Sequence, residues 1–393
     1  MQVEDFKDSP VGRLTPISGT DSRTRRTFDH FAFVPDALPS EIPLGQATYN
    51  VLSKADRAIG GLNARLSQLP NPSLLVRPAL TQEAMSTSAL EGTYAPLADV
   101  LEAQYGNTDH LSSEVREIRN YVSAADRGLE LIRTHPICLR VVAELQRVLV
   151  DRTRGDSYDA GQLRDRLVCI GDRGRGIEQS RFVPPPHGDA LIEGVSDWEK
   201  WINRVDDIPI LVKAAMGHYQ FETLHPFSDG NGRIGRLTIT LQLIAAGVLD
   251  YPVLNLSPWL EPRRDDYIDH LLRISKTGQY DGWVSFFAEA VTVRSEAAIQ
   301  TIEDLMSFRE EVLFDLREKK FTGVVTQLGG DLIGYPIVSV NDVKEIYNVA
   351  YPTANNAVAK LCEAGYLKEL TGRSYGRLFV CDRVYDVINN GNE

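Results

Sequence analysis

Residues 225–236 read HPFSDGNGRIGR and form the densest set of chemically useful side chains in the sequence. Apolar residues recur at helical spacing on both sides of this stretch. The positions before it are Leu211, Ala214, Ala215, His218, Phe221 and Leu224, and those after it are Ile234, Leu237, Leu241 and Ile244. The stretch is therefore predicted to join two amphipathic helices, the first beginning near Pro209 and the second ending at Gly247.

The centre of the stretch has the pattern of an anion-binding loop. Gly230 and Gly232 flank Asn231 where the second helix opens, so several backbone N–H groups point outward at the positive end of the helix dipole. Arg233 and Arg236 are three residues apart and share one helix face. Two guanidinium groups beside such a cradle suit a polyphosphate better than a single carboxylate.

Two further side chains supply the rest of a phosphate-transfer site. Asp229 offers a hard oxygen ligand for Mg²⁺, and His225 is the group here whose usual pKa lets it take a proton near neutral pH. Asp-Gly and Asn-Gly are also common in ordinary turns, and a histidine at a helix end is often structural. A calcium loop would need a downstream glutamate and a P-loop a Gly-Lys-Ser/Thr run, and both are missing.

The twelve residues match the Fic motif, H-x-F-x-[D/E]-G-N-G-R-x-x-R, at every defined position. The chain thus resembles Fic-family protein adenylyltransferases, which implies a helical fold and transfer of AMP from ATP to a Ser, Thr or Tyr hydroxyl of a protein. By this resemblance His225 deprotonates the target hydroxyl and Asp229 holds Mg²⁺ on the α- and β-phosphates. The other motif residues would be the anion hole Gly230, Asn231 and Gly232, the phosphate ligands Arg233 and Arg236, and the core anchor Phe227.

A second match lies well before the motif, at residues 83–93, EAMSTSALEGT. Taken alone, Gly92 would stop a helix and Glu91 would be a solvated glutamate. The run also fits the family's inhibitory helix, [S/T]-x-x-x-E-[G/N], through Thr87, Glu91 and Gly92. The resemblance implies that Glu91 pairs with Arg236 and keeps the γ-phosphate of ATP out of its site.

Two other segments agree with the family. Residues 166–171 and 180–183 predict a short β-hairpin, which resembles the family's flap for docking a target strand by backbone hydrogen bonds. An ordinary surface hairpin is the alternative. Tyr267 is a candidate for adenine contact, with a role in the core as the alternative. Residues 262–263 are Pro-Arg where relatives often carry Asn-Arg, which leaves the local nucleotide contacts open.

The C-terminal block predicts a winged helix-turn-helix. A helix at 340–347, a helix at 353–363 and two strands near 366–370 and 377–380 are expected there. A DNA-binding regulator is therefore the rival function. Residues 336–390 hold six Lys/Arg and six Asp/Glu, a balance of 6 − 6 = 0, on a chain with net charge −12. This balance disfavours DNA binding and favours protein docking or packing.

The fold class expected is mainly α: a Fic-type helical bundle with a small β-hairpin flap, an N-terminal helical region and a C-terminal winged helix-turn-helix. The predicted domains are 1–110, with the inhibitory helix at about 81–92, then the catalytic core at 111–320, and the winged helix-turn-helix at 330–393. Residues 1–28 read as a weakly ordered lead-in with the basic cluster Arg23, Arg25 and Arg26.

Composition sets broader limits on the 393-residue chain. Its 43% apolar and 24% charged residues are ordinary for a globular protein. No apolar run is long enough to span a membrane, the acidic N-terminus does not resemble a signal peptide, and four scattered cysteines predict reduced thiols. We therefore expect a cytoplasmic enzyme without membrane contact, whose partners are ATP and a target protein or the chain itself.

The resemblance also suggests a homodimer. A Fic enzyme that uses another nucleotide or removes AMP stays an alternative.

Overall fold

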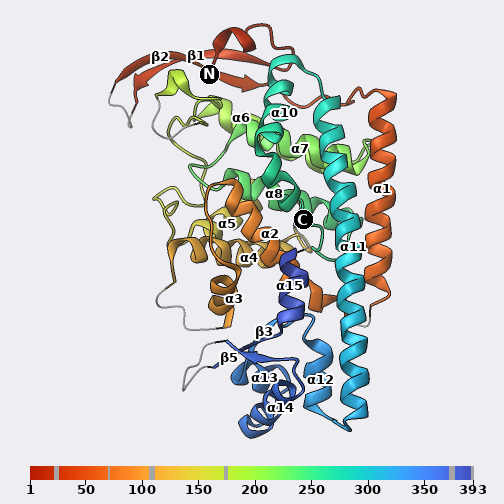
Figure 1. The fold of residues 1–393 in the computed structure, drawn as a ribbon. Coiled ribbons are helices and arrows are strands. Elements are labelled where there is room, and N and C mark those ends of the chain that lie inside the picture. Colours follow the sequence, from red (N-terminus) through yellow and green to blue (C-terminus); the bar gives the residue numbers. More distant parts are fainter. Residues whose placement is uncertain (22–25, 70, 106–110, 172–175, 371–376, 391–393) are drawn as a thin grey trace. The chain divides into compact units, whose positions relative to one another are not determined.

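The computed structural model describes residues 1–21, 26–69, 71–105, 111–171, 176–370 and 377–390 (Figure 1). The fold is mainly helical with two small sheets, as predicted. The chain divides into two compact units, each built from three segments. The first contains Met1–Arg57, Ser123–Leu249 and Leu260–Thr292, and the second contains Ala58–Val122, Asp250–Trp259 and Val293–Glu393. The three consecutive domains expected from the sequence stay a prediction.

Most helices lie where the hydrophobic periodicity places them. Four elements have residues in both units: α1 (Gln46–Ser67), α4 (Ser113–Leu131), α9 (Ser257–Leu260) and α11 (Asp281–Glu318). The first unit also contains η1 (Val3–Phe6), β1 (Gly12–Thr20), β2 (Thr27–Pro35), α5 (Leu139–Val150), η3 (Ile177–Gln179), α6 (Asp189–Asn203), α7 (Ile210–Leu224), α8 (Asn231–Ala245), η4 (Glu261–Arg263) and α10 (Arg264–Thr277). The second unit also contains η2 (Pro72–Leu75), α2 (Val76–Leu90), α3 (Leu97–Tyr105), α12 (Val324–Asp331), β3 (Ile337–Ser339), α13 (Val340–Ile346), α14 (Tyr351–Glu363), β4 (Lys368–Glu369), β5 (Leu378–Val380) and α15 (Asp382–Asn390).

Helices α7 and α8 form the centre of the first unit. Both helices are buried on nearly every face, and they contact each other as well as α5, α6 and α10. Pro209 is the N-cap of α7 and Gly247 follows α8 with φ +70°, so the predicted start and end of this helix pair are confirmed. The predicted motif therefore connects two packed helices and is held at both ends.

The prediction of a weakly ordered lead-in is wrong. Strands β1 and β2 pair antiparallel from Gly12 opposite Pro35 to Thr20 opposite Thr27, and Figure 1 shows them as a long two-stranded ribbon. An isolated hairpin of two strands is marginal in water, so packing against other parts of the unit decides its stability. Of the basic cluster, Arg26 is exposed, whereas Arg23 and Arg25 lie outside the described residues.

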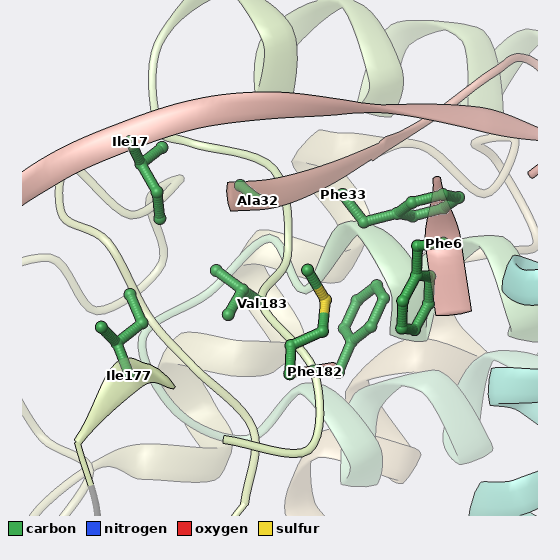
Figure 2. Close-up of a cluster of buried hydrophobic side chains, with 8 residues drawn as sticks. Phe6, Ile17, Ala32, Phe33, Ile177, Phe182 and Val183 are labelled. Atoms are coloured by element: carbon green, nitrogen blue, oxygen red, sulfur yellow. The ribbon is translucent and has the colours of Figure 1, made fainter. Parts of the chain in front are cut away.

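A buried apolar cluster connects this ribbon to the flap segment, residues 166–186 (Figure 2). The rings of Phe6, Phe33 and Phe182 lie with centroids 5.5–5.9 Å apart. The Phe33 N–H of β2 also donates to the Val183 carbonyl at 2.9 Å. These contacts explain why a polar N-terminal sequence is ordered: its few aromatic residues meet partners about 150 positions away in the chain.

The predicted flap hairpin is shorter than expected. In the described part of this segment the pairing consists of one antiparallel bridge between Ile170 and Phe182, with the Ile170 N–H donating to the Phe182 carbonyl at 2.9 Å. Residues 172–175, in the connection between the two expected strands, lie outside the described residues. Phe182 and Val183 are thus held by contact with β2 as well as by the bridge to Ile170.

The C-terminal module, residues 337–390, contains the helices and strands expected from the sequence. It also contains strand β3, which was not predicted, and its sheet has the order β3-β5-β4. Ser339 begins α13 with a capping box closed by Asp342. The predicted loop at 371–376 lies outside the described residues. The apolar face of the sheet packs on α2 and α3 through a cluster that contains Met85, Leu97, Leu101, Ile337, Leu378, Val380 and Tyr385.

Two predictions from composition can be compared with the structure. All four cysteines are free. Within the described part of the chain, no helix combines the length and apolar character that crossing a membrane requires.

Replacing Phe33 with alanine tests the buried cluster. Phe33 is 0% exposed and Phe31, two positions earlier on the same strand, is 38% exposed. We expect Phe33→Ala to lower the free energy of unfolding by about 3–5 kcal/mol because it leaves a cavity, and Phe31→Ala to cost under about 1 kcal/mol. Urea unfolding of both variants measures this, and equal losses would contradict the role of the cluster.

Candidate active site

His225 lies at the C-terminal end of α7 in a strained backbone conformation. Its φ and ψ are 49° and 60°, in the left-handed region, and its N–H donates to the Phe221 carbonyl at 2.9 Å. This conformation ends the helix and turns the chain into the motif loop. Left-handed non-glycine residues are uncommon, and such strain concentrates at functional sites.

The side chain of Arg164 stabilises this turn through hydrogen bonds to the backbone. The buried guanidinium group, on a residue 2% exposed, donates to four backbone carbonyl oxygens. These belong to His225 at 2.8 Å, Leu224 at 3.3 Å, Pro185 at 2.6 Å and Arg166 at 3.0 Å. Burial lowers the pKa of Arg164 to about 10, so the group remains charged at neutral pH. Sequence reasoning missed Arg164, because no motif marks it.

Asn231 closes the motif loop with its side chain. The Phe227 N–H donates to Asn231 Oδ1 at 2.8 Å, and Asn231 Nδ2 donates to the Phe227 carbonyl at 2.7 Å. The amide is therefore occupied within the loop, and the part of Asn231 suited to an anion is its backbone N–H. Phe227 is fully buried against Phe221, which confirms it as an apolar anchor.

The predicted anion cradle corresponds to the first turn of α8. Gly230 is its N-cap with φ +83°, and a Cβ added there would lie 2.9 Å from Leu149 Cδ2, so only glycine fits. Asn231, Gly232 and Arg233 follow, with no acidic side chain in this turn. The first N–H groups of a helix have no partner inside it, so this turn is suited to phosphate oxygens.

Asp229 is held beside the cradle. Its Oδ1 accepts from the Gly230 N–H at 2.6 Å and lies 3.3 Å from Arg233 Nη2. Gln146 fixes the Asp229 carbonyl at 3.1 Å through its Nε2, and its Oε1 accepts from the Gly161 N–H at 2.6 Å. Gln146, on α5, is a second supporting residue that the sequence did not reveal.

The single carboxylate of Asp229 fits a Mg²⁺ ion that is bound together with a phosphate ligand. Among the described residues no group of three or more His, Cys, Asp or Glu side chains could hold a metal. Mg²⁺ commonly uses one or two carboxylates plus substrate phosphates rather than a complete protein cage. Asp229, with its side chain 33% exposed beside the cradle, could supply that carboxylate.

The motif arginines lie in a strongly buried environment. Arg233 and Arg236 are 1% and 3% exposed. Next to Arg236, burial and the arginine charge together lower the pKa of His218 to about 3. His218 Nε2 lies 2.6 Å from the Tyr267 hydroxyl, and Tyr267 itself is buried on α10. The geometry thus favours the core role of Tyr267 that the sequence left open, and adenine contact stays a prediction.

A polar cluster holds Ser228 of the motif loop in place. The Ser228 hydroxyl donates to Asp159 and accepts from Arg166 Nε at 3.1 Å. Burial opposes the charge of Asp159, but the hydroxyls of Ser157 and Ser228 outweigh it, so the pKa of the carboxyl is lowered. An ionised Asp159 therefore ties the motif loop to the start of the flap segment.

The second sequence match forms a well-defined helix end in the second unit. Helix α2 ends at Leu90, Glu91 is its C-cap, and Gly92 takes φ +82°. The N–H groups of Gly92 and Thr93 close the helix on the Ala89 and Ser88 carbonyls, each at 2.9 Å. Gly92 is thus a left-handed helix stop, as predicted. Thr87 is fully buried, and the inhibitory role of Thr87, Glu91 and Gly92 stays a prediction.

Comparison with known proteins identifies this arrangement. The Fic/DOC family N-terminal domain matches residues 49–130, and the Fic/DOC family domain matches residues 136–243, which contain the whole motif. The fold and the site therefore define a Fic-type protein. Residues 49–130 and 136–243 thus match the two domains of the Fic/DOC family.

Individual relatives agree with the family. "Protein adenylyltransferase Fic" of Drosophila ananassae is 26% identical over 281 residues, 66% of this chain and 51% of the relative. The protein of the same name from Aedes aegypti is 31% identical over 156 residues, 39% of this chain and 27% of the relative. The chain thus spans about half the length, or less, of these curated relatives. A crystal structure of a Fic family protein from Desulfovibrio desulfuricans shares the fold, with a TM-score of 0.57 and 21% identity over 88% of this chain and 98% of that one.

Gly155 offers a test of the position of Asp229. A Cβ at Gly155 would lie 2.7 Å from Asp229 Oδ2, whereas one at Gly60 would meet nothing within 4 Å. We expect Gly155→Ala to displace the carboxylate and weaken Mg²⁺-dependent ATP binding by about 10- to 100-fold. Gly60→Ala is the control and should bind as wild type. Calorimetric titration with and without Mg²⁺ measures this, and wild-type affinity in Gly155→Ala would contradict the assignment.

The lowered pKa of His218 predicts that the free energy of unfolding depends on pH. Its pKa in the folded chain is about 3, below its ordinary value of 6.5, so below pH 6.5 the unfolded chain binds more protons. Stability from neutral His218 is therefore complete above pH 6.5 and is lost as pH falls toward 3. Between pH 6.5 and 5 wild type should lose about 1–2 kcal/mol of unfolding free energy more than His218→Gln. The exposed His187→Gln is the control, and identical pH slopes of wild type and His218→Gln in urea unfolding would disprove this.

Proposed function

We propose that this chain transfers AMP from ATP to a Ser, Thr or Tyr hydroxyl of a protein. The observation that carries the proposal is that two helix ends lie on either side of the motif loop. His225 ends α7, and the predicted anion cradle at Gly230 opens α8. A base and an anion site are thereby fixed within a few residues of each other. The curated relatives that are named protein adenylyltransferase support the same chemistry.

In the proposed reaction His225 accepts the proton of the target hydroxyl. The hydroxyl oxygen forms a bond to the α-phosphorus of ATP, the bond from that phosphorus to the bridging oxygen breaks, and pyrophosphate leaves. The first turn of α8, with Arg233 and Arg236, stabilises the charge that gathers on the leaving pyrophosphate. Mg²⁺ held by Asp229 would supply further charge neutralisation on the phosphates.

The flap segment is the proposed docking edge for the target. Extended segments bind to exposed strand edges through backbone hydrogen bonds, and the antiparallel bridge between Ile170 and Phe182 supports this proposal. Arg164 contacts the Pro185 carbonyl at the end of the flap and the carbonyl of His225. One side chain thus sets the distance between a docked segment and the base.

We further propose that Glu91 inhibits the reaction by pairing with Arg236, which takes away a ligand of the γ-phosphate. The defined end of α2 supports a fixed position for Glu91, because the helix stop at Gly92 orients the residue before it. A carboxylate in a phosphate site also repels the nucleotide. Arg236 is buried whereas Glu91 is exposed, so the proposed pair is partly buried and its loss costs less than that of a fully buried pair.

The C-terminal module is better explained by packing than by DNA binding. Two polar residues of α14, the second helix of the predicted helix-turn-helix, have partners within the module's own unit: Lys360 Nζ lies 5.3 Å from the centroid of the Phe321 ring, and Asn355 Oδ1 accepts from Arg377 at 3.3 Å. Base-reading side chains must instead reach outward.

Transfer of label from α-phosphate-labelled ATP tests the function. We expect strong labelling of lysate proteins or of the chain itself by Glu91→Gly, little by wild type, and a loss of about 10²–10⁴-fold when His225→Asn is added to Glu91→Gly. Asparagine is chosen because it tolerates the left-handed backbone of His225 better than alanine does. Glu363→Gly, near the end of α14, and the exposed His187→Asn are the matched controls.

The outcomes separate the two proposals. A Glu91→Gly variant no faster than wild type would remove the inhibitory role but keep the transfer. Absence of label in every variant, with ATP still bound, would reject AMP transfer and redirect the test to other labelled nucleotides and to removal of AMP.

A further inference from the structure

A cavity in the first unit lies between two loops of the chain. Its first wall is formed by residues 39–44, which connect β2 to α1, and its second wall by residues 206–209, which lead into α7. Tyr49, Val212 and Tyr280 complete the lining. The cavity has a volume of about 940 Å³. This volume is at the upper end of the range of about 300–1,000 Å³ in which proteins bind ligands.

The cavity is separate from the candidate active site. It lies at the beginning of α7, whereas His225 lies at the end of this helix. Helix α7 has 15 residues, so at about 1.5 Å per residue its two ends are about 22 Å apart. Residues 225–236 are not part of the cavity lining. An occupant of the cavity therefore does not compete with a nucleotide at the motif loop.

Hydrogen bonds hold the first wall at both of its ends. The Pro39 carbonyl accepts from Trp201 Nε1 at 2.8 Å. At the other end, the Gly45 N–H donates to Asp281 Oδ1 at 2.7 Å. The wall is thus formed before any ligand arrives, and binding to a preformed wall loses less free energy to ordering.

The charge of Asp206, on the second wall, is balanced inside the protein. Its carboxylate accepts from Arg204 Nε at 2.7 Å and lies 2.9 Å from Lys213 Nζ. It also accepts from the Ile208 N–H at 3.1 Å. Asp206 therefore fixes the loop that carries Asp207 and leaves little charge of its own for a ligand.

Glu41 and Asp207 give the cavity an uncompensated negative charge. Glu41 lies on the first wall and Asp207 on the second, and both are exposed. Within the described part of the chain neither carboxylate has a hydrogen bond or an ion pair with another residue, and no lysine, arginine or histidine belongs to the described lining. The cavity therefore attracts a cation. A bare metal ion fits poorly, because the described residues contain no group of three or more side chains that could hold one.

The other lining residues are suited to an organic cation. The lining includes two tyrosines, the exposed Tyr49 and the buried Tyr280, and three prolines, Pro39, Pro43 and Pro209. A guanidinium group stacks on aromatic rings and also pairs with carboxylates through two parallel hydrogen bonds. A lysine ammonium is a strongly hydrated point charge and does this less well. Arginine is therefore the side chain that matches both parts of the lining.

We propose that this cavity binds an extended segment of a partner protein that carries arginine residues. A single guanidinium compound would fill a small part of the volume and could not pair with carboxylates on both walls. In a segment with two arginines, the guanidinium groups pair with Glu41 and Asp207, and the rest of the segment covers the tyrosines and prolines. This docking site is additional to the proposed AMP transfer and does not depend on it.

Binding is measured by titration calorimetry on the full chain, without ATP. The probe is a capped alanine peptide that contains two arginines. The comparison peptides carry lysine or the neutral isostere citrulline in place of both arginines, and argininamide represents a free small cation. We expect saturable binding of the arginine peptide, and at least about tenfold weaker binding of the citrulline peptide and of argininamide. The lysine peptide should bind more weakly than the arginine peptide.

A pair of double variants tests the place of binding. Glu41→Gln with Asp207→Asn should weaken binding of the arginine peptide by about 3- to 10-fold, because each exposed ion pair contributes a small amount. Asp29→Asn with Glu193→Gln is the control, since both residues are exposed and lie outside the lining. The control makes the same change to the net charge of −12, so it measures non-specific attraction of a basic peptide.

The outcomes decide each part of the proposal. Equal binding by wild type and the cavity variant, or equal weakening in both double variants, would overturn the site. Equal binding of the arginine, lysine and citrulline peptides would overturn the ligand chemistry. Argininamide that binds as tightly as the peptide would overturn the partner segment. The peptide comparisons use wild type, so they stay decisive even when a variant folds poorly.

Discussion

The buried guanidinium group of Arg164 is the interaction on which the candidate site depends. It satisfies carbonyl oxygens at the end of α7 and at both ends of the flap segment, and the Arg164 N–H adds a bond to the Pro226 carbonyl at 3.0 Å. A buried charge is tolerated when hydrogen bonds of this kind replace water. The carbonyls in turn need these donors, because the left-handed turn at His225 takes them out of the helical pattern. The strained turn at His225 and the flap segment are thus held by one cation.

The motif could be predicted from sequence because its chemistry is local. Asn231 binds Phe227 four positions away, and Gly230 caps the helix that follows it. The supporting residues could not be found in this way. Arg164 acts on His225 over a separation of 61 residues, and Gln146 acts on Asp229 over 83. Sequence spacing carries no information on such pairs until the helices are packed.

The N-terminal ribbon shows the same limit for the fold. Residues 1–28 are mostly polar, and hydrophobic pattern alone gave no reason to expect a strand there. The ribbon is stabilised by Phe33 against Phe6 and Phe182, a contact made only in the folded unit. Long helices such as α7 and α8 were predictable because their periodicity extends over many turns, whereas a short strand depends on its neighbours. Strand β3 of the C-terminal module also depends on tertiary context, because it forms by pairing with β5.

The charge of the motif connects the proposed activity with its proposed inhibition. Residues 225–236 contain one carboxylate, Asp229, and two arginines, a balance of 2 − 1 = +1 before the helix dipole is added. Both arginines are almost fully buried, and buried positive charge is costly unless an anion compensates it. The neutral state of His218 limits this excess without removing it. An anion bound at the motif loop would place further negative charge beside these guanidinium groups. In the proposed function the phosphates of ATP would supply this charge in the active state and the Glu91 carboxylate would supply it in the inhibited state, so one electrostatic property would account for both proposals.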